Sequence, residues 1–223
     1  MIFNKIKKAI VFAPHLDDET ISMGGTIVKL LKKNIDVKII VVGGHLPPLY
    51  SKKTYDITKN EFYKSMETLK VKNYKLLNLP ATTFNEFKTS EFNMLLQKEL
   101  DLYKPDVVFT PFPDRHIDHR IVFNSVMVIT RPIQKNSPKI ILAYETLSET
   151  HWNASYIENN FNPNYFINIS DELNQKINAY KKYKSQINKS RSPKSLKSLA
   201  SFRGTQNNCE YAESFVLIRC IDY

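Results

Sequence analysis

The sequence predicts an α/β fold built on a Rossmann-like, mostly parallel sheet with helices on both faces. Three observations lead to this prediction. Short apolar runs alternate with segments of helical spacing through residues 8–144. One of these runs, residues 36–42, is continuous and mostly β-branched, which is typical of a strand buried on both faces. With 223 residues, 42% of them hydrophobic, the chain is also long enough to bury a large core.

The first strand–helix–strand unit begins near the N-terminus. Residues 8–13 form a short apolar run, and residues 19–33 then carry apolar side chains at helical spacing. The strand expected at 36–42 ends at Gly43 and Gly44, because paired glycines interrupt a regular strand. A unit of this order favours parallel pairing through a right-handed crossover.

The same alternation continues to residue 144. Apolar side chains at helical spacing predict three more helices, and the short apolar runs between them predict strands. The expected helices are 58–69, 90–103 and 119–129, and the expected strands are 74–79, 106–110 and 139–144. Proline marks two of these boundaries, since Pro105 introduces a strand and Pro132 closes a helix.

The C-terminal third is expected to extend the same sheet. The predicted elements are a strand at 165–169, a helix at 171–186 with Ser170 as its cap, a helix at 195–202 and a strand at 211–221. Residues 1–223 are therefore interpreted as a single domain. Two long connections, 44–56 and 145–163, lack a clear period, and we expect them to form the walls of a substrate cleft.

Composition restricts the setting of the protein. The net charge of +10 suggests nucleic-acid binding, but lysine far outnumbers arginine and the basic residues are spread among Asn, Ser and Tyr. This pattern favours solvated faces, so no nucleic-acid partner is expected. No apolar stretch approaches the ~18 residues of a membrane span or forms a signal-peptide core. A cytoplasmic protein is expected, with Cys209 and Cys220 as free thiols.

Two polar clusters follow predicted strands. The first is His15-Leu16-Asp17-Asp18-Glu19 and the second is His116-Ile117-Asp118-His119. Ligands of open α/β sheets bind beyond the carboxyl ends of the strands, where both clusters fall. We expect His15, Asp18 and His119 to hold one metal ion. Two histidines and one carboxylate leave a coordination position for water, as catalytic sites do.

The remaining residues of the clusters can then take part in hydrolysis. Such a metal lowers the pKa of bound water from about 15.7 to about 7, which makes hydroxide available. Asp17 is placed to act as the general base, and His116 to stabilise an oxyanion, a contribution of about 3 kcal/mol. Asp118 is expected to fix a histidine tautomer. The helix dipole also favours acidic residues at the start of a helix, whatever their function. Two such clusters, each at the end of a strand, are better explained by a metal site.

Several motifs carry a family resemblance. They are residues 13–20 (APHLDDET), 24–26 (GGT), 105–108 (PDVV), 114–119 (DRHIDH), 144–145 (YE), 185–186 (SQ), 202–204 (FRG) and 211–215 (YAESF). With these motifs the chain resembles the zinc-dependent N-acetylglucosaminide deacetylases of the LmbE and PIG-L type along nearly its whole length.

The resemblance implies an enzyme that removes the N-acetyl group from an N-acetylated amino sugar or sugar conjugate, releasing acetate and a free amine. It implies one zinc ion per chain at His15, Asp18 and His119, although this donor set also suits other divalent metals. Asp17 falls on the general base of the family and His116 on its oxyanion-stabilising histidine. The expected partner is a small N-acetylated molecule, and assembly into a homo-oligomer is considered.

The chain departs from the family pattern at two positions. Leu16 stands where the family usually has proline, and Thr58 stands where an arginine often precedes the glutamate matched by Glu61. The reaction type is therefore better specified than the substrate. Arg203 matches a recurrent arginine that either forms a salt bridge to Glu213 or contacts the substrate, and we favour the salt bridge.

Alternative interpretations remain at this stage. The same site could hydrolyse another amide or an ester, or the chain could be a catalytically weak module that binds sugar or nucleic acid. Trp152 could stack on a sugar ring or anchor its loop to the core. His45 and His151, in the two long loops, could line the cleft or lie exposed.

Overall fold

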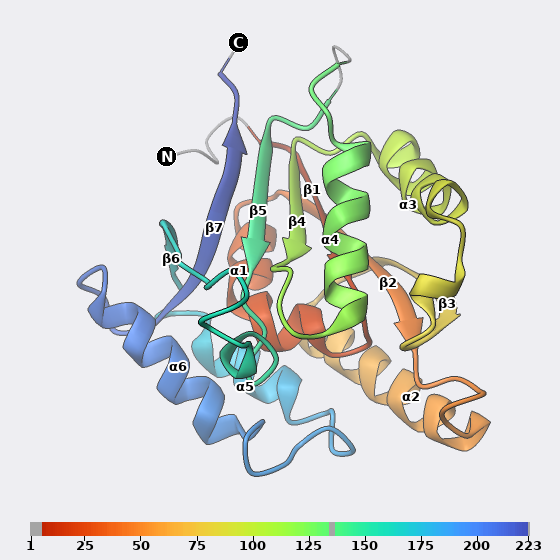
Figure 1. Cartoon of the computed structure of the whole chain (residues 1–223). Helices are drawn as coiled ribbons and strands as arrows, with labels where there is room; N and C mark the ends of the chain where they lie inside the picture. The colour runs from red at the N-terminus through yellow and green to blue at the C-terminus, as the bar shows by residue number, and fades with distance from the viewer. Residues whose placement is uncertain (1–5, 134–136, 223) are drawn as a thin grey trace.

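The computed structural model describes residues 6–133 and 137–222. Its strands are β1 (Lys8–Ala13), β2 (Asp36–Gly44), β3 (Asn73–Pro80), β4 (Val107–Pro111), β5 (Ile140–Tyr144), β6 (Tyr165–Asn168) and β7 (Ala212–Cys220). They form one seven-stranded sheet in the order β3-β2-β1-β4-β5-β7-β6 (Figure 1). The first five strands run parallel, whereas β7 pairs antiparallel with β5 and β6. The predicted fold class is confirmed, including the C-terminal extension of the sheet.

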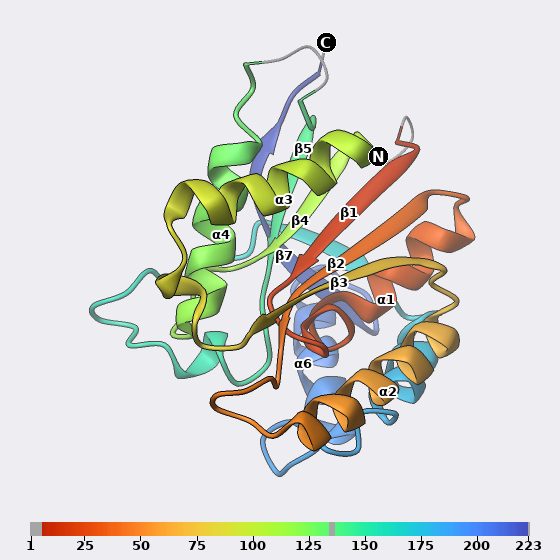
Figure 2. The same cartoon turned by 90° about the vertical axis from the view of Figure 1, so that its right-hand side faces the viewer.

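Helices cover both faces of the sheet. They are α1 (Asp18–Lys32), α2 (Lys52–Leu69), α3 (Thr89–Tyr103), α4 (Ile117–Ile129), α5 (Leu173–Tyr180) and α6 (Pro193–Thr205), with short 3-10 turns η2 (Phe84–Glu86) and η3 (Thr150–Trp152). One face carries α3 and α4, and the other carries α1, α2, α5 and α6 (Figure 2). None of the helices described is long and apolar enough to cross a membrane.

Strand β1 shows why the sheet needs two helical layers. Its side chains alternate between the faces, so Val11 packs into the core beneath α1 while Ile10 and Phe12 pack into the core beneath α3 and α4. All three are fully buried. A strand buried on both faces reads as a continuous apolar run, which is why the sequence identifies it well.

Strands β1 and β4 are neighbours, and their continuations leave the sheet on opposite faces. The chain passes from β1 into α1 and from β4 into α4. This divergence opens a crevice at the carboxyl ends of the two strands, the place where open α/β sheets bind ligands. The carboxyl ends of β1 and β4 lie toward the lower edge of the sheet in Figure 1.

Two helix boundaries lie six residues from those predicted, whereas the others lie within three. Helix α2 begins at Lys52 rather than residue 58, because the Ser51 hydroxyl accepts from the Thr54 N–H at 3.1 Å and caps the helix. Helix α5 ends at Tyr180, not residue 186. Its cap is Glu172 rather than Ser170, whose hydroxyl donates instead to Asn168. Residues 181–192 consequently form turns near the site.

Helix α1 is kinked at Met23, which has φ −140° and ψ 24°. The kink leaves the N–H groups of Gly25 and Thr26 without helical acceptors, and the Glu213 carboxylate of β7 accepts both at 2.9 and 2.6 Å. Lys176 of α5 pairs with the same carboxylate at 2.6 Å. Glu213 thus joins α1, α5 and β7.

The salt bridge predicted between Arg203 and Glu213 is wrong. Glu213 forms its ion pair with Lys176. Arg203 instead donates two hydrogen bonds, of 2.8 and 2.6 Å, to Glu145, which follows β5. The Ser214 hydroxyl donates to Glu145 as well, at 2.5 Å. Both cysteines are free thiols, as predicted.

Candidate active site

Three elements bring the predicted metal ligands together. His15 follows β1, Asp18 opens α1, and His119 lies in the first turn of α4. Asp18 Oδ2 is 3.1 Å from His15 Nδ1 and 3.4 Å from His119 Nε2. One potential ligand atom from each residue lies within 4.8 Å of the others, so the three side chains could hold one metal ion.

The surroundings of the two histidines fit such an ion. His15 Nε2 lies 2.9 Å from Asp118 Oδ2, and His119 Nδ1 lies 3.0 Å from Asp114 Oδ2. Each ring therefore has one nitrogen held by a carboxylate and the other turned toward Asp18, the usual arrangement of metal-binding histidines. His119 Nε2 is buried and has no hydrogen-bond partner among the residues described. A metal ion would satisfy this atom.

The charges at this point favour a cation. Burial alone would lower the pKa of His15, but its hydrogen bonds to Asp118 and Asp18 outweigh burial and raise that pKa to about 9. Burial likewise lowers the pKa of His119, and the charges of Asp18 and Asp114 raise it to about 10. The carboxylates thus stabilise positive charge where the ligand atoms meet, and a metal ion would replace the protons.

Asp17 lies beside the triad at the N-cap position of α1 and is buried. Burial, and then the charge of Asp18, raise the pKa of Asp17 to about 6. Within the described part of the chain, Asp17 Oδ2 has no hydrogen-bond partner. A carboxylate with these properties can exchange a proton near neutral pH, as a general base must.

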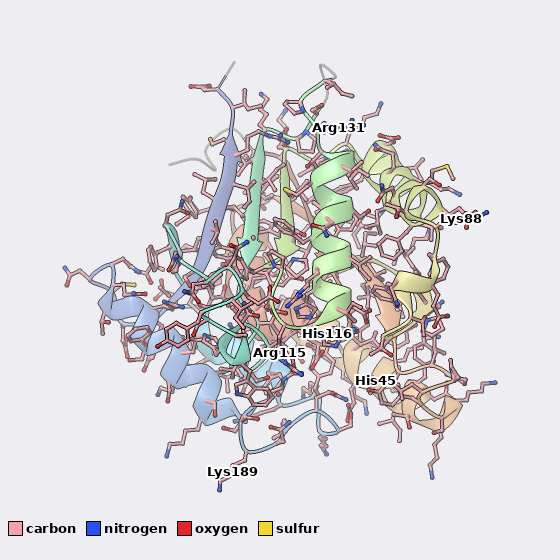
Figure 3. The ribbon with its side chains drawn as sticks, in the orientation of Figure 1. His45, Lys88, Arg115, His116, Arg131 and Lys189 are labelled. Atoms are coloured by element: carbon pink, nitrogen blue, oxygen red, sulfur yellow. The ribbon has the colours of Figure 1, made fainter. Side chains whose placement is uncertain are left out.

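His116 caps α4 and points into the same crevice from the lower end of that helix (Figure 3). Its Nδ1 accepts the Asp118 N–H at 3.2 Å, which places the proton of the neutral ring on Nε2. Burial lowers the pKa of His116 to about 4, with the charges of His15 and His119 adding to the effect. The ring is therefore a neutral hydrogen-bond donor at pH 7.

Asp118 faces His15 rather than the cavity. Its Oδ2 accepts the Thr82 N–H at 2.7 Å in addition to its contact with His15. This geometry suits the predicted role of fixing a histidine tautomer, and it leaves Asp118 outside the residues that line the cavity.

A cavity of about 260 Å³ opens over these groups. Both predicted loops contribute to its walls, with His45 and Tyr50 from one and Ser148, Glu149 and Trp152 from the other. Trp152 is 58% exposed at the rim, so it does not anchor its loop in the core. His151 is not among the residues that line the cavity, and its Nε2 lies 3.1 Å from Glu145 Oε2.

Sequence reasoning missed three groups at the site. Asp114, the partner of His119, had a signal, because it stands five residues earlier in the same motif. Glu149 and Arg191 had none, since they come from turns without a motif. Arg191 Nη2 donates to Glu149 at 2.7 Å, and Arg191 Nη1 is 3.5 Å from Asp17 Oδ2.

Comparison with known proteins relates the chain to a family of de-N-acetylases. The family model of GlcNAc-PI de-N-acetylase (PIG-L) matches residues 10–130. A diacetylchitobiose deacetylase of Thermococcus kodakarensis is 27% identical over 241 residues, covering 95% of this chain and 83% of that protein.

Solved structures share the fold over nearly the whole chain. The N,N'-diacetylchitobiose deacetylase of Pyrococcus horikoshii, complexed with its inhibitor MPG, superposes with a TM-score of 0.77 at 26% identity, covering 97% of this chain and 85% of that one. A 4-carboxy-2-hydroxymuconate hydratase from Pseudomonas putida KT2440 has a TM-score of 0.76 at 14% identity, covering 97% and 98%. The second likeness concerns the fold alone.

Proposed function

Because the chain belongs to the GlcNAc-PI de-N-acetylase (PIG-L) family, we propose that it hydrolyses the N-acetyl group of an N-acetylated amino sugar or sugar conjugate. The products are acetate and a free amine. The observation that carries this proposal is the convergence of His15, Asp18 and His119 on one point beside Asp17 and His116.

His15, Asp18 and His119 would hold one zinc ion. When bound, the ion supplies Lewis-acid chemistry that lowers the pKa of water and polarises a carbonyl group. Asp118 and Asp114 hold the two histidine rings in place by their remaining nitrogens. Two histidines and a carboxylate also suit other divalent ions, so zinc is the proposed rather than the required metal.

Asp17 and His116 handle the proton and the developing charge. Asp17 Oδ2 takes a proton from the attacking water and later delivers it to the departing amine nitrogen. His116 Nε2–H donates a hydrogen bond to the oxygen of the acetamide as that oxygen becomes negative, a contribution of about 3 kcal/mol.

We propose a single-domain cytoplasmic enzyme that acts on a small N-acetylated molecule and has no nucleic-acid partner. The relatives named as deacetylases of diacetylchitobiose make that disaccharide the first substrate to try.

The decisive experiment measures acetate release from diacetylchitobiose and from other N-acetylated sugar conjugates by the zinc-loaded protein. We expect release that requires about one equivalent of metal and stops with a chelator. Zinc binding without acetate release from any acetylated sugar, but with cleavage of other amides or esters, would assign the site to a different hydrolysis. Protein that binds neither metal nor substrate would contradict an enzymatic role.

A further inference from the structure

Arg191 reaches the cavity from the turns that follow α5. Tyr180 donates its hydroxyl to the Arg191 carbonyl at 2.8 Å, and the Arg191 N–H donates to Asn188 Oδ1 at 2.9 Å. The Arg191 backbone is therefore held through both its N–H and its carbonyl group. The side chain is 17% exposed and lines the cavity beside Asp17.

The guanidinium of Arg191 is only partly used by the protein. Its Nε donates to Ser148 Oγ at 2.7 Å and its Nη2 to Glu149 Oε1 at 2.7 Å. The contact of Nη1 with Asp17 Oδ2, at 3.5 Å, is too long for a strong hydrogen bond. A guanidinium has five N–H groups, so three of them have no close acceptor among the residues described and are available to a bound molecule.

The positive charge of Arg191 already faces two carboxylates. Glu149 and Asp17 are both within ion-pair distance of it, and Glu149 also pairs with Arg115 at 2.6 Å. Lys189, in the same turn, extends away from the molecule (Figure 3). Of the described residues that line the cavity, no other lysine or arginine accompanies Arg191.

Apart from Glu149, most other side chains that line the cavity away from the metal-ligand group are polar and uncharged. They are Tyr50, Thr82, Gln186, Asn188 and Ser190, with Trp152 at the rim. Hydroxyl and amide groups exchange hydrogen bonds with sugar hydroxyls, and an aromatic ring can cover the apolar face of a sugar. A phosphate group, in contrast, is best bound by cations that have no carboxylate partner.

We propose that Arg191 is a specificity-determining residue that donates hydrogen bonds to hydroxyl groups of an uncharged sugar. This inference rests on the proposed function and deepens it, because it selects free N-acetylated oligosaccharides over sugars linked to phosphate. The three available N–H groups hold the sugar ring so that its acetamide lies beside Asp17 and His116.

The test compares Arg191→Met and Arg191→Lys with the wild type, all loaded with zinc. We expect Arg191→Met to raise KM for diacetylchitobiose by roughly tenfold or more while kcat falls much less, because hydrogen bonds to the bound sugar are lost. Arg191→Lys should give an intermediate KM, since it keeps the charge but not the planar set of donors. Lys189→Met, in the same turn, is the matched control and should match the wild type.

Two further measurements test the charge of the ligand. The wild type should use UDP-N-acetylglucosamine at least about tenfold less efficiently than diacetylchitobiose. KM for the disaccharide should stay constant between about 50 and 500 mM salt, because no charge pair with the ligand is screened. Equal or better use of the phosphate-linked sugar would overturn the assignment to uncharged sugars.

The remaining outcomes also decide the matter. A KM within twofold of wild type in Arg191→Met, or in Arg191→Lys if the first variant does not fold, overturns the role of Arg191. Absence of acetate release by the wild type from every sugar contradicts the proposed function instead. In that case calorimetric binding of cellobiose, which has no acetamide, to the wild type and Arg191→Lys tests this inference: weaker binding by the variant supports it, and equal or undetectable binding by both overturns it.

Discussion

Asp17 and His116 are both buried, yet burial prepares them for opposite tasks. Burial raises the pKa of the Asp17 carboxyl to about 6, so the group accepts a proton readily at neutral pH. The same effect lowers the pKa of His116 to about 4 and keeps its ring a neutral donor. Two groups beside one metal-ligand triad can thereby divide proton transfer and charge stabilisation between them.

Replacing Asp17 by Asn should separate turnover from metal binding. We expect Asp17→Asn to keep about one equivalent of zinc and to lose kcat by about 10²- to 10⁴-fold, because the amide cannot take a proton. His15→Ala should lose both metal and activity. Metal content and kcat are measured together. The control is Asp101→Asn, a change at an exposed residue of α3. Full activity of Asp17→Asn would show that another group is the base.

Replacing His116 by Ala should act on the chemical step. The variant loses the donor to the developing oxyanion, so we expect kcat to fall by about 10²- to 10³-fold with little change in KM. Steady-state kinetics on diacetylchitobiose check this, together with metal content. A large loss of zinc in His116→Ala would instead place this histidine among the metal ligands, as the proximity of His15, His116 and Asp118 allows.

Prediction from sequence located residues that stand in short motifs. The structure brings His15, Asp18 and His119 together, as expected, because the ends of neighbouring parallel strands lie at one edge of the sheet. Arg203 was paired wrongly, because a long side chain on a helix has several carboxylates within reach and sequence does not rank them. Arg191 carried no signal, since its position depends on how residues 181–192 turn back over the cavity.

At the scale of elements, one buried carboxylate holds the kinked helix α1 in position. Glu213 of β7 accepts the N–H groups exposed by the kink and pairs with Lys176 of α5. Gly25 lets α1 pack closely against Ile169, because a Cβ at this position would lie within 2.9 Å of Ile169 side-chain atoms. The turn that carries Asp17 and Asp18 therefore depends on contacts made more than 180 residues later.

Removing Glu213 should cost much more stability than removing an exposed ion pair. In Glu213→Gln, Lys176 keeps a buried charge without a carboxylate, and we expect the free energy of unfolding to fall by about 3 to 5 kcal/mol. The matched control is Lys32→Met on α1. The Lys32 side chain is 52% exposed and pairs with Glu172. That change should cost no more than about 1 kcal/mol. Urea unfolding of both variants measures the difference, and equal losses would contradict the role of Glu213.

At the scale of the whole molecule, the parallel pairing of the first five strands was predictable, because helices alternate with these strands along the chain. The placement of β7 between β5 and β6 was not, because a strand's partners depend on long-range pairing rather than on its own apolar pattern. The position of β7 matters for the site. Its Glu213 accepts hydrogen bonds from α1, and its Ser214 donates one to Glu145. The late strand thus supports groups that the early strands place.

The pairing of Glu145 should make the stability of the whole molecule depend on acid pH. Burial alone would raise the pKa of Glu145, but hydrogen bonds from His151, Arg203 and Ser214 outweigh it and lower that pKa to about 2. A folded-state pKa below the ordinary value of 4.5 means that the stabilisation is complete above about pH 4.5 and is lost as pH falls toward 2. The stabilisation that disappears over this window is about 3 kcal/mol.

Comparing wild type with Glu145→Gln isolates this contribution from that of the other carboxyl groups. We expect the variant to be less stable than wild type at pH 7 and the difference in free energy of unfolding to shrink steadily between about pH 4.5 and 2, because protonation then removes the same ion pair from the wild type. Urea unfolding at a series of pH values gives both curves, with exposed Glu91→Gln as the control. A difference that stays constant across this range would show that Glu145 titrates alike in the folded and unfolded chain, and that the Arg203 pair does not tie α6 to the sheet through charge.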